Sequence, residues 1–497
     1  MSTNYKPLLA LAFGLFIAIG VLVRPFGAPA VLVGGTLAAV AGFIISRYEH
    51  DKSFLLNVLI AGLIVRVTIG TLIFTFELQE FFGGDAFTYD QLGAQMLRSW
   101  QGKADAEEGL PHYAEFSQTF PGILYLVASV YAVAGRNMLA VQFVNAVTGA
   151  ATAPVIYLCA QHIFRNLRVA RLSALFTAFF PSLALWSSQG LKDGPIVLLL
   201  ALIMLATLRL GERMSVKYLL ILAFSLFAVL SLRFYIFYMM VVAVAASFVI
   251  GMRAVSAQSL VRQSIAVVCT GLALTYMGVL RSADRQIGQF ADLKVVQQSR
   301  SDLVKKANTA FGADLDVSTP TGALAAIPLG LTYLLLAPFP WQVANLRQSI
   351  TLPEMLIWWA SIPLLMLGLW FTLKFRLRQS LPILLFTLML TLSYSIFQGN
   401  VGTAYRQRAQ LLAFYFIYVA AGCVLLKERG EDQRLLDRAE RERERAAAAV
   451  RIRRRDRNVE WGFLADRLSG ALTTTPRRER DAEWESLASR LSKKAGF

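Results

Sequence analysis

Two carboxylates stand where an apolar run gives way to a new helical pattern, and both are suited to acid–base chemistry. Asp85 follows Gly83-Gly84 in the first long polar stretch, and Asp193 follows Gly190 between two apolar runs. A carboxylate in such a place can take the proton of an attacking hydroxyl or amine. Each can equally be no more than the cap of the helix that it begins. The pattern alone leaves both interpretations open.

Cationic side chains at the ends of apolar runs form a second group with a chemical use. They are Lys192, Arg233, Arg406 and Arg408. A guanidinium binds phosphate through two parallel hydrogen bonds, so arginines at headgroup depth suit a lipid-borne phosphate. The alternative is that they snorkel to the phosphates of ordinary lipids. Arg66 differs, because it lies in the middle of an apolar run and should face the protein interior or an aqueous cavity.

The elements that position these residues are apolar helices. The chain is 56% hydrophobic and 16% charged, with a mean hydropathy of +0.53, which excludes an ordinary soluble protein. A helix needs about 20 apolar residues to cross a bilayer. The predicted spans are 7–23, 28–45, 54–76, 138–163, 170–188, 195–210, 217–233, 234–252, 263–280, 354–373, 381–397 and 409–426. The sequence therefore predicts an all-α polytopic membrane protein with about 12 transmembrane helices.

The charges of the loops predict the orientation. Two more apolar stretches, 120–135 and 324–341, are short and bounded by prolines, and we expect interfacial or re-entrant helices that do not cross. The loops rich in Lys and Arg are 46–53, 164–171, 209–217, 253–262 and 374–378. The positive-inside rule places these loops and both termini on the cytoplasmic side. We therefore expect a multi-pass protein of the inner (plasma) membrane. The extracytoplasmic face then holds the long loops 77–119 and 281–323 and the turns 189–194, 342–353 and 398–408.

The chain divides into a predicted transmembrane domain, 1–426, and a basic cytoplasmic tail, 427–497. Arg, Glu and Asp alternate through 428–445, which favours a helix with i,i+4 ion pairs. The tail is either a solvated extension or an element that lies on the membrane or docks a partner. We interpret the net charge of +17 as an excess of basic residues in cytoplasmic loops that attracts anionic lipids, and not as a sign of nucleic-acid binding. The three cysteines and three histidines are scattered, which excludes a His/Cys metal cluster.

Short motifs around the two carboxylates resemble those of a known superfamily. They are Gly84-Asp85-Ala86-x-x-Tyr89-x-x-Leu92-Gly93, then Thr119-Phe120-Pro121-Gly122, then the stretch from Pro181 to Asp193. Together they resemble the GT-C superfamily of membrane glycosyltransferases, in particular the protein mannosyltransferase-like and aminoarabinose transferase-like enzymes. The likeness covers about residues 54–252 and, more weakly, the turn with Arg406 and Arg408. It departs from the family at Ala86, where the common Asp-Glu pair has its second acid, and in two extra spans before the first loop.

The resemblance implies a GT-C-like fold and an inverting transfer of a sugar from a polyprenyl-phosphate or polyprenyl-diphosphate donor. The transfer would occur at the extracytoplasmic face, and the acceptor would be a glycan, a lipid or a protein. Asp85 would be the base, and Asp193 would orient the acceptor or hold Asp85 and a cation. The donor or its lipid phosphate would be bound by Tyr89, Lys192, Arg233, Arg406 and Arg408.

Other interpretations stay open at this point. No cofactor is certain. A divalent cation is possible, but it needs oxygen ligands, and two carboxylates are too few to assert it. An oligosaccharide repeat-unit polymerase or ligase would also use arginines on the extracytoplasmic side. A transporter or flippase of lipid-linked glycans would also need intramembrane charge such as Arg66. Polysaccharide biosynthesis in the cell envelope is the process that these functions share.

Overall fold

The computed structural model describes residues 5–48, 50–82, 84–103, 121–250, 271, 292–305, 309–343, 345–472 and 484–490. In these residues the regular structure is helical, apart from one isolated antiparallel bridge between Ala310 and Asn400. The predicted all-α class is confirmed. The chain separates into two compact units, Met1–Leu425 and Leu426–Phe497.

In the described part of the chain, seven helices are long and apolar enough to cross a membrane. They are α2 (Gly27–Ser46), α3 (Lys52–Thr75), α8 (Met138–Phe164), α11 (Asp193–Glu212), α18 (Leu346–Phe375), α19 (Leu377–Phe397) and α20 (Val401–Leu472). Shorter apolar helices are α1 (Lys6–Leu22), α7 (Pro121–Ala134), α12 (Val216–Leu232), α13 (Phe234–Ile250) and α17 (Pro320–Leu336). The polytopic membrane class is therefore confirmed. The span predicted at 263–280 lies outside the described residues, apart from Gly271, as do the basic loop 253–262 and much of both long loops.

One predicted span is not continuous. Residues 170–188 form the end of α9 (Leu167–Phe179) and then α10 (Pro181–Trp186), with a break at Phe180. Pro181 causes the break, because it has no backbone N–H to donate and disfavours a helical conformation in the residue before it. The break leaves backbone carbonyls at the end of α9 that need other donors.

Arg66 supplies those donors from the middle of α3. Its guanidinium donates to the carbonyls of Ala178 at 2.7 Å and Thr177 at 3.3 Å, and its Nε donates to Ser187 Oγ at 2.8 Å. The side chain is buried, so the expectation that it faces the protein interior is confirmed. Arg66 thereby fastens α3 to the broken helix and to the segment that leads towards Asp193.

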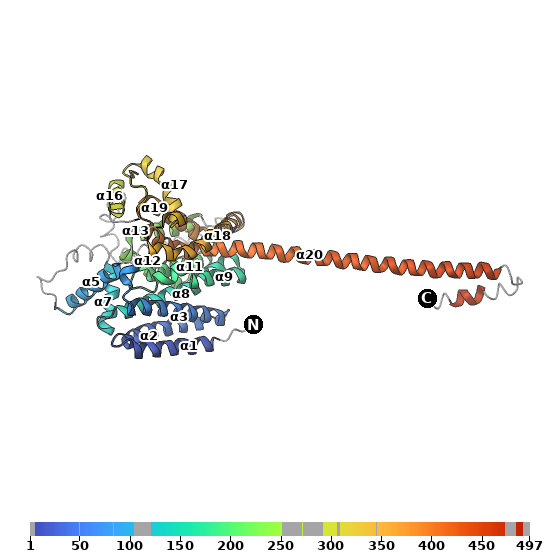
Figure 1. Cartoon of the computed structure of the whole chain (residues 1–497), viewed down its shortest axis with the longest axis horizontal. Helices are drawn as coiled ribbons and strands as arrows, with labels where there is room; N and C mark the ends of the chain where they lie inside the picture. Colours follow the sequence, from blue (N-terminus) through green and yellow to red (C-terminus); the bar gives the residue numbers. More distant parts are fainter. Residues whose placement is uncertain are drawn as a thin grey trace. The chain divides into compact units, whose positions relative to one another are not determined.

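Helix α8 lies at the centre of the membrane unit and packs against α3, α9 and α11 (Figure 1). Small residues permit this close approach. A Cβ at Gly149 of α8 would lie 2.4 Å from Ser187, and one at Gly194 of α11 would lie 2.9 Å from the backbone oxygen of Asn145. The chain from Ser187 to Gly194 is therefore pressed against α8, which fixes where α11 begins.

Helix α5 (Asp85–Trp100) is amphipathic. Tyr89, Leu92 and Met96 are among its buried residues, and it packs on α7. Asp90 of α5 accepts a hydrogen bond from the Tyr131 hydroxyl at 2.5 Å and pairs with Arg136 at 2.5 Å. These bonds fix the helix that begins at Asp85. The other short helices are α4 (Gln79–Phe82), α16 (Leu293–Lys305) and the 3₁₀ helix η1 (Pro340–Gln342).

The second unit, Leu426–Phe497, contains the charged part of α20 and a short helical segment at 484–490. The helix predicted for 428–445 is confirmed, because α20 runs to Leu472. Trp461 and Phe463 of this unit are 52% and 73% exposed. Docking of the tail to a membrane or a partner stays a prediction.

Candidate active site

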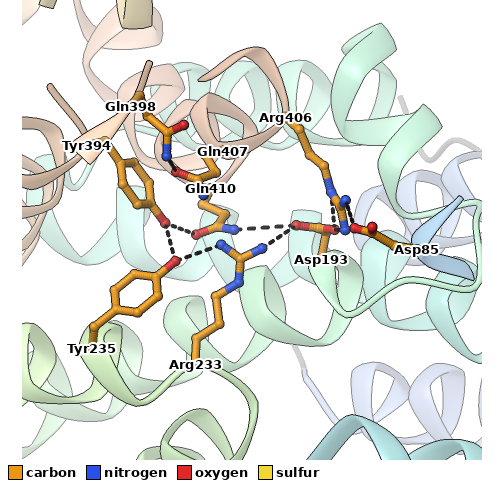
Figure 2. Close-up of polar contacts among 9 residues, drawn as sticks. All are labelled: Asp85, Asp193, Arg233, Tyr235, Tyr394, Gln398, Arg406, Gln407 and Gln410. Atoms are coloured by element: carbon orange, nitrogen blue, oxygen red, sulfur yellow. Dashed lines mark hydrogen bonds and ion pairs between the residues drawn. The ribbon is translucent and has the colours of Figure 1, made fainter. Parts of the chain in front are cut away.

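Asp85 and Asp193 are brought to one guanidinium. Arg406 Nη1 lies 2.5 Å from Asp85 Oδ2, while Nη2 and Nε lie 2.7 and 2.9 Å from Asp193 Oδ2 (Figure 2). The three residues come from three helices, because α5 begins at Asp85, α11 begins at Asp193 and α20 carries Arg406 in its second turn. Arg406 thus joins the two carboxylates, and all three residues are ones that the sequence analysis names.

Neither carboxylate acts as a helix cap. The N-cap residue of α5 is Gly84 and that of α11 is Lys192, and neither helix has a side-chain capping bond. The interpretation of Asp85 and Asp193 as simple caps is therefore wrong. Each is the first residue of its helix, where the helix dipole favours a negative charge. Their side chains are instead turned towards Arg406 (Figure 2).

The two carboxylates differ in exposure, which gives them different uses. The side chain of Asp85 is 54% exposed, whereas that of Asp193 is 4% exposed. A buried carboxylate needs compensating partners. Asp193 Oδ1 has two, Arg233 Nη2 and Gln410 Nε2, each at 3.4 Å. Asp193 is thus suited to hold cations, and Asp85 is the carboxylate that a substrate can reach.

A row of polar side chains continues from Arg233 into the bundle. Arg233 Nη1 donates to the Tyr235 hydroxyl at 2.9 Å, which lies 3.5 Å from the Tyr394 hydroxyl. Tyr394 in turn donates to Gln410 Oε1 at 2.7 Å (Figure 2). Sequence reasoning missed Tyr235, Tyr394 and Gln410. The available signal was polarity inside apolar spans, since such residues are expensive there and usually have a purpose.

Lys192 and Tyr89 complete the lining on the side of α5. Lys192 Nζ lies 5.9 Å from the centre of the Tyr89 ring, and both residues are buried. Burial lowers the pKa of Lys192, which precedes the span of α11, to about 7, and the positive charges of Arg233 and Arg406 act in the same direction. Burial also raises the pKa of the Tyr89 hydroxyl. Lys192 therefore changes its charge near neutral pH.

Cationic groups outnumber carboxylates in this cluster. Three described cations interact there with two described carboxylates. The cations are Lys192, Arg233 and Arg406, and the carboxylates are Asp85 and Asp193. Arg406 also lies over the Trp186 ring, with its Cζ 5.5 Å from the ring centre. A surplus of positive charge between helix N-termini attracts anions.

Arg408 lies apart from the group. It is buried, and its Nη1 donates to the backbone carbonyls of Ala337 at 2.9 Å and Leu335 at 3.1 Å, at the end of α17. Its Nη2 is 2.9 Å from Met355 Sδ. Residues two positions apart in an α-helix are about 200° apart around its axis, so Arg406 and Arg408 face different neighbours. The structure therefore does not bring Arg408 to the phosphate-binding group in which the sequence analysis places it.

Residues 118–279 match the model of the family described as dolichyl-phosphate-mannose-protein mannosyltransferase. This part of the chain is similar to a GT-C-type glycosyltransferase domain. The resemblance seen in the sequence is thereby confirmed. No curated protein matches the chain.

The GT-C-type segment contains only part of the cluster. Asp193, Lys192 and Arg233 lie within the matched residues, whereas Asp85 and Arg406 lie before and after them. The fold brings the outer two to the matched part, since Arg406 bonds to Asp193. The cluster thus links the family segment to the rest of the membrane unit.

The described residues of the cluster do not form a ready-made metal site. In the described residues no three His, Cys, Asp or Glu side chains gather as metal ligands. A divalent cation shared by Asp85 and Asp193 would have to take the place of the Arg406 guanidinium that now joins them. Whether a cation binds stays a prediction, which transfer assays with and without a chelator would test.

Proposed function

We propose that this protein transfers a sugar from a polyprenyl-phosphate or polyprenyl-diphosphate donor to an acceptor at the extracytoplasmic face of the membrane. The observation that carries the proposal is the Arg406 guanidinium between Asp85 and Asp193. It combines a reachable carboxylate with an anion-binding group in a GT-C-type membrane glycosyltransferase. The face of the membrane follows from the predicted positions of the basic loops.

The cations would bind the donor phosphate. Arg233 and Lys192 lie within the same cluster as Arg406, and Arg406 has a guanidinium fork that suits two phosphate oxygens. When phosphate arrives, Arg406 would exchange Asp85 for phosphate oxygens and keep Asp193. Donor binding therefore releases the exposed carboxylate. Asp193 and Gln410 would hold Arg406 and Arg233 in position throughout.

Asp85 would then serve as the general base. It takes the proton of the acceptor hydroxyl or amine while that atom attacks the anomeric carbon of the sugar. The bond between the anomeric carbon and the phosphate oxygen breaks, and its electron pair leaves on the phosphate. The arginines stabilise this negative charge as it develops. Attack opposite the leaving phosphate inverts the configuration of the sugar.

The proposal is tested with the full chain in proteoliposomes that contain a radiolabelled polyprenyl-phosphate sugar and a mixture of acceptors. We expect a new, inverted glycosidic bond and release of polyprenyl phosphate. Movement of the intact donor across the bilayer without bond formation would instead assign the protein as a flippase. Joining of preformed oligosaccharides, with no use of single sugars, would assign it as a polymerase or ligase.

A further inference from the structure

A cavity lies outside the charged cluster. Its volume is about 320 Å³, at the lower end of the range for small-molecule pockets. The residues that line it and that matter here are Thr309, Tyr333, Phe339, Gln342, Gln348 and Val401. They come from the segment after α16, the end of α17, η1 and the residue before it, the start of α18 and the first turn of α20. Nothing in the proposed transfer step uses this cavity.

The cavity belongs to the end of the bundle at which α20 begins. Val401 N donates to the carbonyl of Thr309 at 3.0 Å, and Phe311 N donates to the carbonyl of Gly399 at 2.9 Å. Arg406 follows Val401 on the same helix, about 7.5 Å farther along the axis at 1.5 Å per residue. A ligand in the cavity would therefore lie near the site without occupying the place of the donor phosphate.

Aromatic rings stiffen one wall of the cavity. The Tyr333 ring stacks on Phe311, with centroids 4.2 Å apart and planes 3° apart, and meets the edge of Phe339 at 5.6 Å. Phe339 in turn stacks on Trp341 at 5.1 Å. Such a ladder holds its rings in fixed positions and offers apolar surface without a long flexible side chain.

Neutral hydrogen-bonding groups form the rest of the wall. Gln342 Nε2 donates to the Tyr333 hydroxyl at 3.2 Å, and Thr309 Oγ1 is bonded to Asn400 Oδ1 at 3.0 Å. The amide of Gln348 also lines the cavity. None of the described residues that line it carries a charged side chain, and neutral amides and hydroxyls favour a neutral ligand over a phosphate. An acyl chain would leave its amides and hydroxyls without partners.

A sugar matches both the aromatic wall and the neutral hydrogen-bonding groups of the cavity. Its C–H faces pack against aromatic rings, and its hydroxyls both donate to and accept from amides and hydroxyls. We propose that this cavity binds a neutral saccharide, and that this saccharide is the acceptor of the transfer. The second half of the proposal rests on the proposed function, and it selects a glycan among the acceptor classes that remain open.

The binding half is tested without any transfer reaction. Saturation-transfer NMR would be recorded on the full chain in nanodiscs with a panel of methyl glycosides of glucose, mannose and galactose disaccharides. We expect at least one of them to bind, and Gln342→Ala and Tyr333→Leu each to weaken its binding by tenfold or more. Gln433→Ala changes another exposed glutamine, in the second unit, and should leave binding unchanged.

Three outcomes separate the possibilities. If no saccharide binds, or if both cavity variants bind as the wild type does, the cavity is not a saccharide site. If decanoate displaces the bound saccharide, the cavity takes acyl chains and the proposal is overturned. Asp85→Asn should keep saccharide binding even where transfer is lost, so a failure of the proposed chemistry would be seen separately. In transfer assays, Gln342→Ala should raise the KM for a glycan acceptor tenfold and leave that for the donor unchanged.

Discussion

Arg406 Nη1 lies 2.5 Å from Asp85 Oδ2, so the carboxylate proposed as the base is paired with a cation in this structure. A paired carboxylate is a poor base, because the ion pair favours its charged form. Binding of an anion to Arg406 weakens that pair. The structure therefore suggests an order of events in which the donor binds before the acceptor is deprotonated.

Replacement of Asp85 tests the base directly. We expect Asp85→Asn to lower the rate of transfer by about 10²–10⁴-fold, the usual contribution of general acid–base catalysis, with donor binding retained. Asn keeps the size of the side chain and removes its basicity. The measurement is single-turnover transfer in proteoliposomes, and Glu80→Gln, an exposed carboxylate in α4, is the matched control. Transfer by Asp85→Asn at the wild-type rate would rule out this mechanism.

Arg406 and Arg408 make a matched pair of substitutions. Arg406→Ala should weaken donor binding by about 1.5–3 kcal/mol, the value of a charge-assisted hydrogen bond. Arg406→Lys should recover only part of this, because lysine lacks the fork. Arg408→Ala should instead lower the midpoint of thermal unfolding, since carbonyls at the end of α17 lose their donor, and donor affinity of the folded protein should not change. Equal donor affinities in wild type and Arg406→Ala would leave only the structural role.

Donor binding should depend on pH through Lys192. Its pKa is lowered to about 7 by burial, so the ammonium that attracts phosphate predominates below pH 7 and is lost as the pH rises. Donor affinity should therefore fall above neutral pH, and bound phosphate shifts the midpoint upwards. Lys192→Arg should remove the dependence between pH 6 and 9, as measured by donor titration. A flat profile in the wild type would exclude a role for the ammonium.

The same lowered pKa has an opposite consequence for stability. The unfolded chain binds a proton at Lys192 up to about pH 10.4, whereas the folded chain releases it near pH 7. Between these values the unfolded state holds more protons, so the free energy of unfolding should rise with pH. Opposite trends of stability and donor affinity above pH 7 would therefore point to the same lysine.

The orientation is tested by labelling single cysteines with an impermeant thiol reagent in whole cells. Ser99 and Ala310 are exposed, and cysteines there should be labelled from outside. Met214 is exposed in the loop between α11 and α12, and Met214→Cys should be labelled only after permeabilisation. Gln189 is unsuitable because the structure buries it. Labelling of Met214→Cys in intact cells would reverse the predicted topology.

The sequence predicted individual site residues better than their arrangement. Asp85, Asp193, Arg233 and Arg406 stand out because charge beside apolar runs is expensive and visible. The convergence of Asp85 and Asp193 on Arg406 is a tertiary fact, since α5, α11 and α20 are far apart in the chain. Arg408 could not be separated from Arg406, because the direction of a side chain depends on the rotation of its helix. Tyr394 and Gln410 were missed because a single polar residue does not interrupt an apolar span.

The fold was largely readable from hydropathy, with one instructive exception. Residues 170–188 are apolar enough for one span, although Pro181 breaks the helix between α9 and α10. The broken helix needs donors for its carbonyls, and Arg66 provides them from another span. A mid-span arginine and a proline-broken neighbour could have been paired in advance by counting unsatisfied backbone groups.

The close packing of Gly149 in α8 has a consequence for how sequence variants are interpreted. A methyl group at this position would collide with Ser187 and come within 2.8 Å of Arg66 Nε, deep in the bundle. The displaced Ser187 would carry the following turn, and with it Asp193, out of register with Arg406. A conservative Gly149→Ala change on an apolar helix would thus lower activity in the way that a substitution in the active site does. Variants that map to the membrane interior of such a protein deserve the same scrutiny as those that alter its charges.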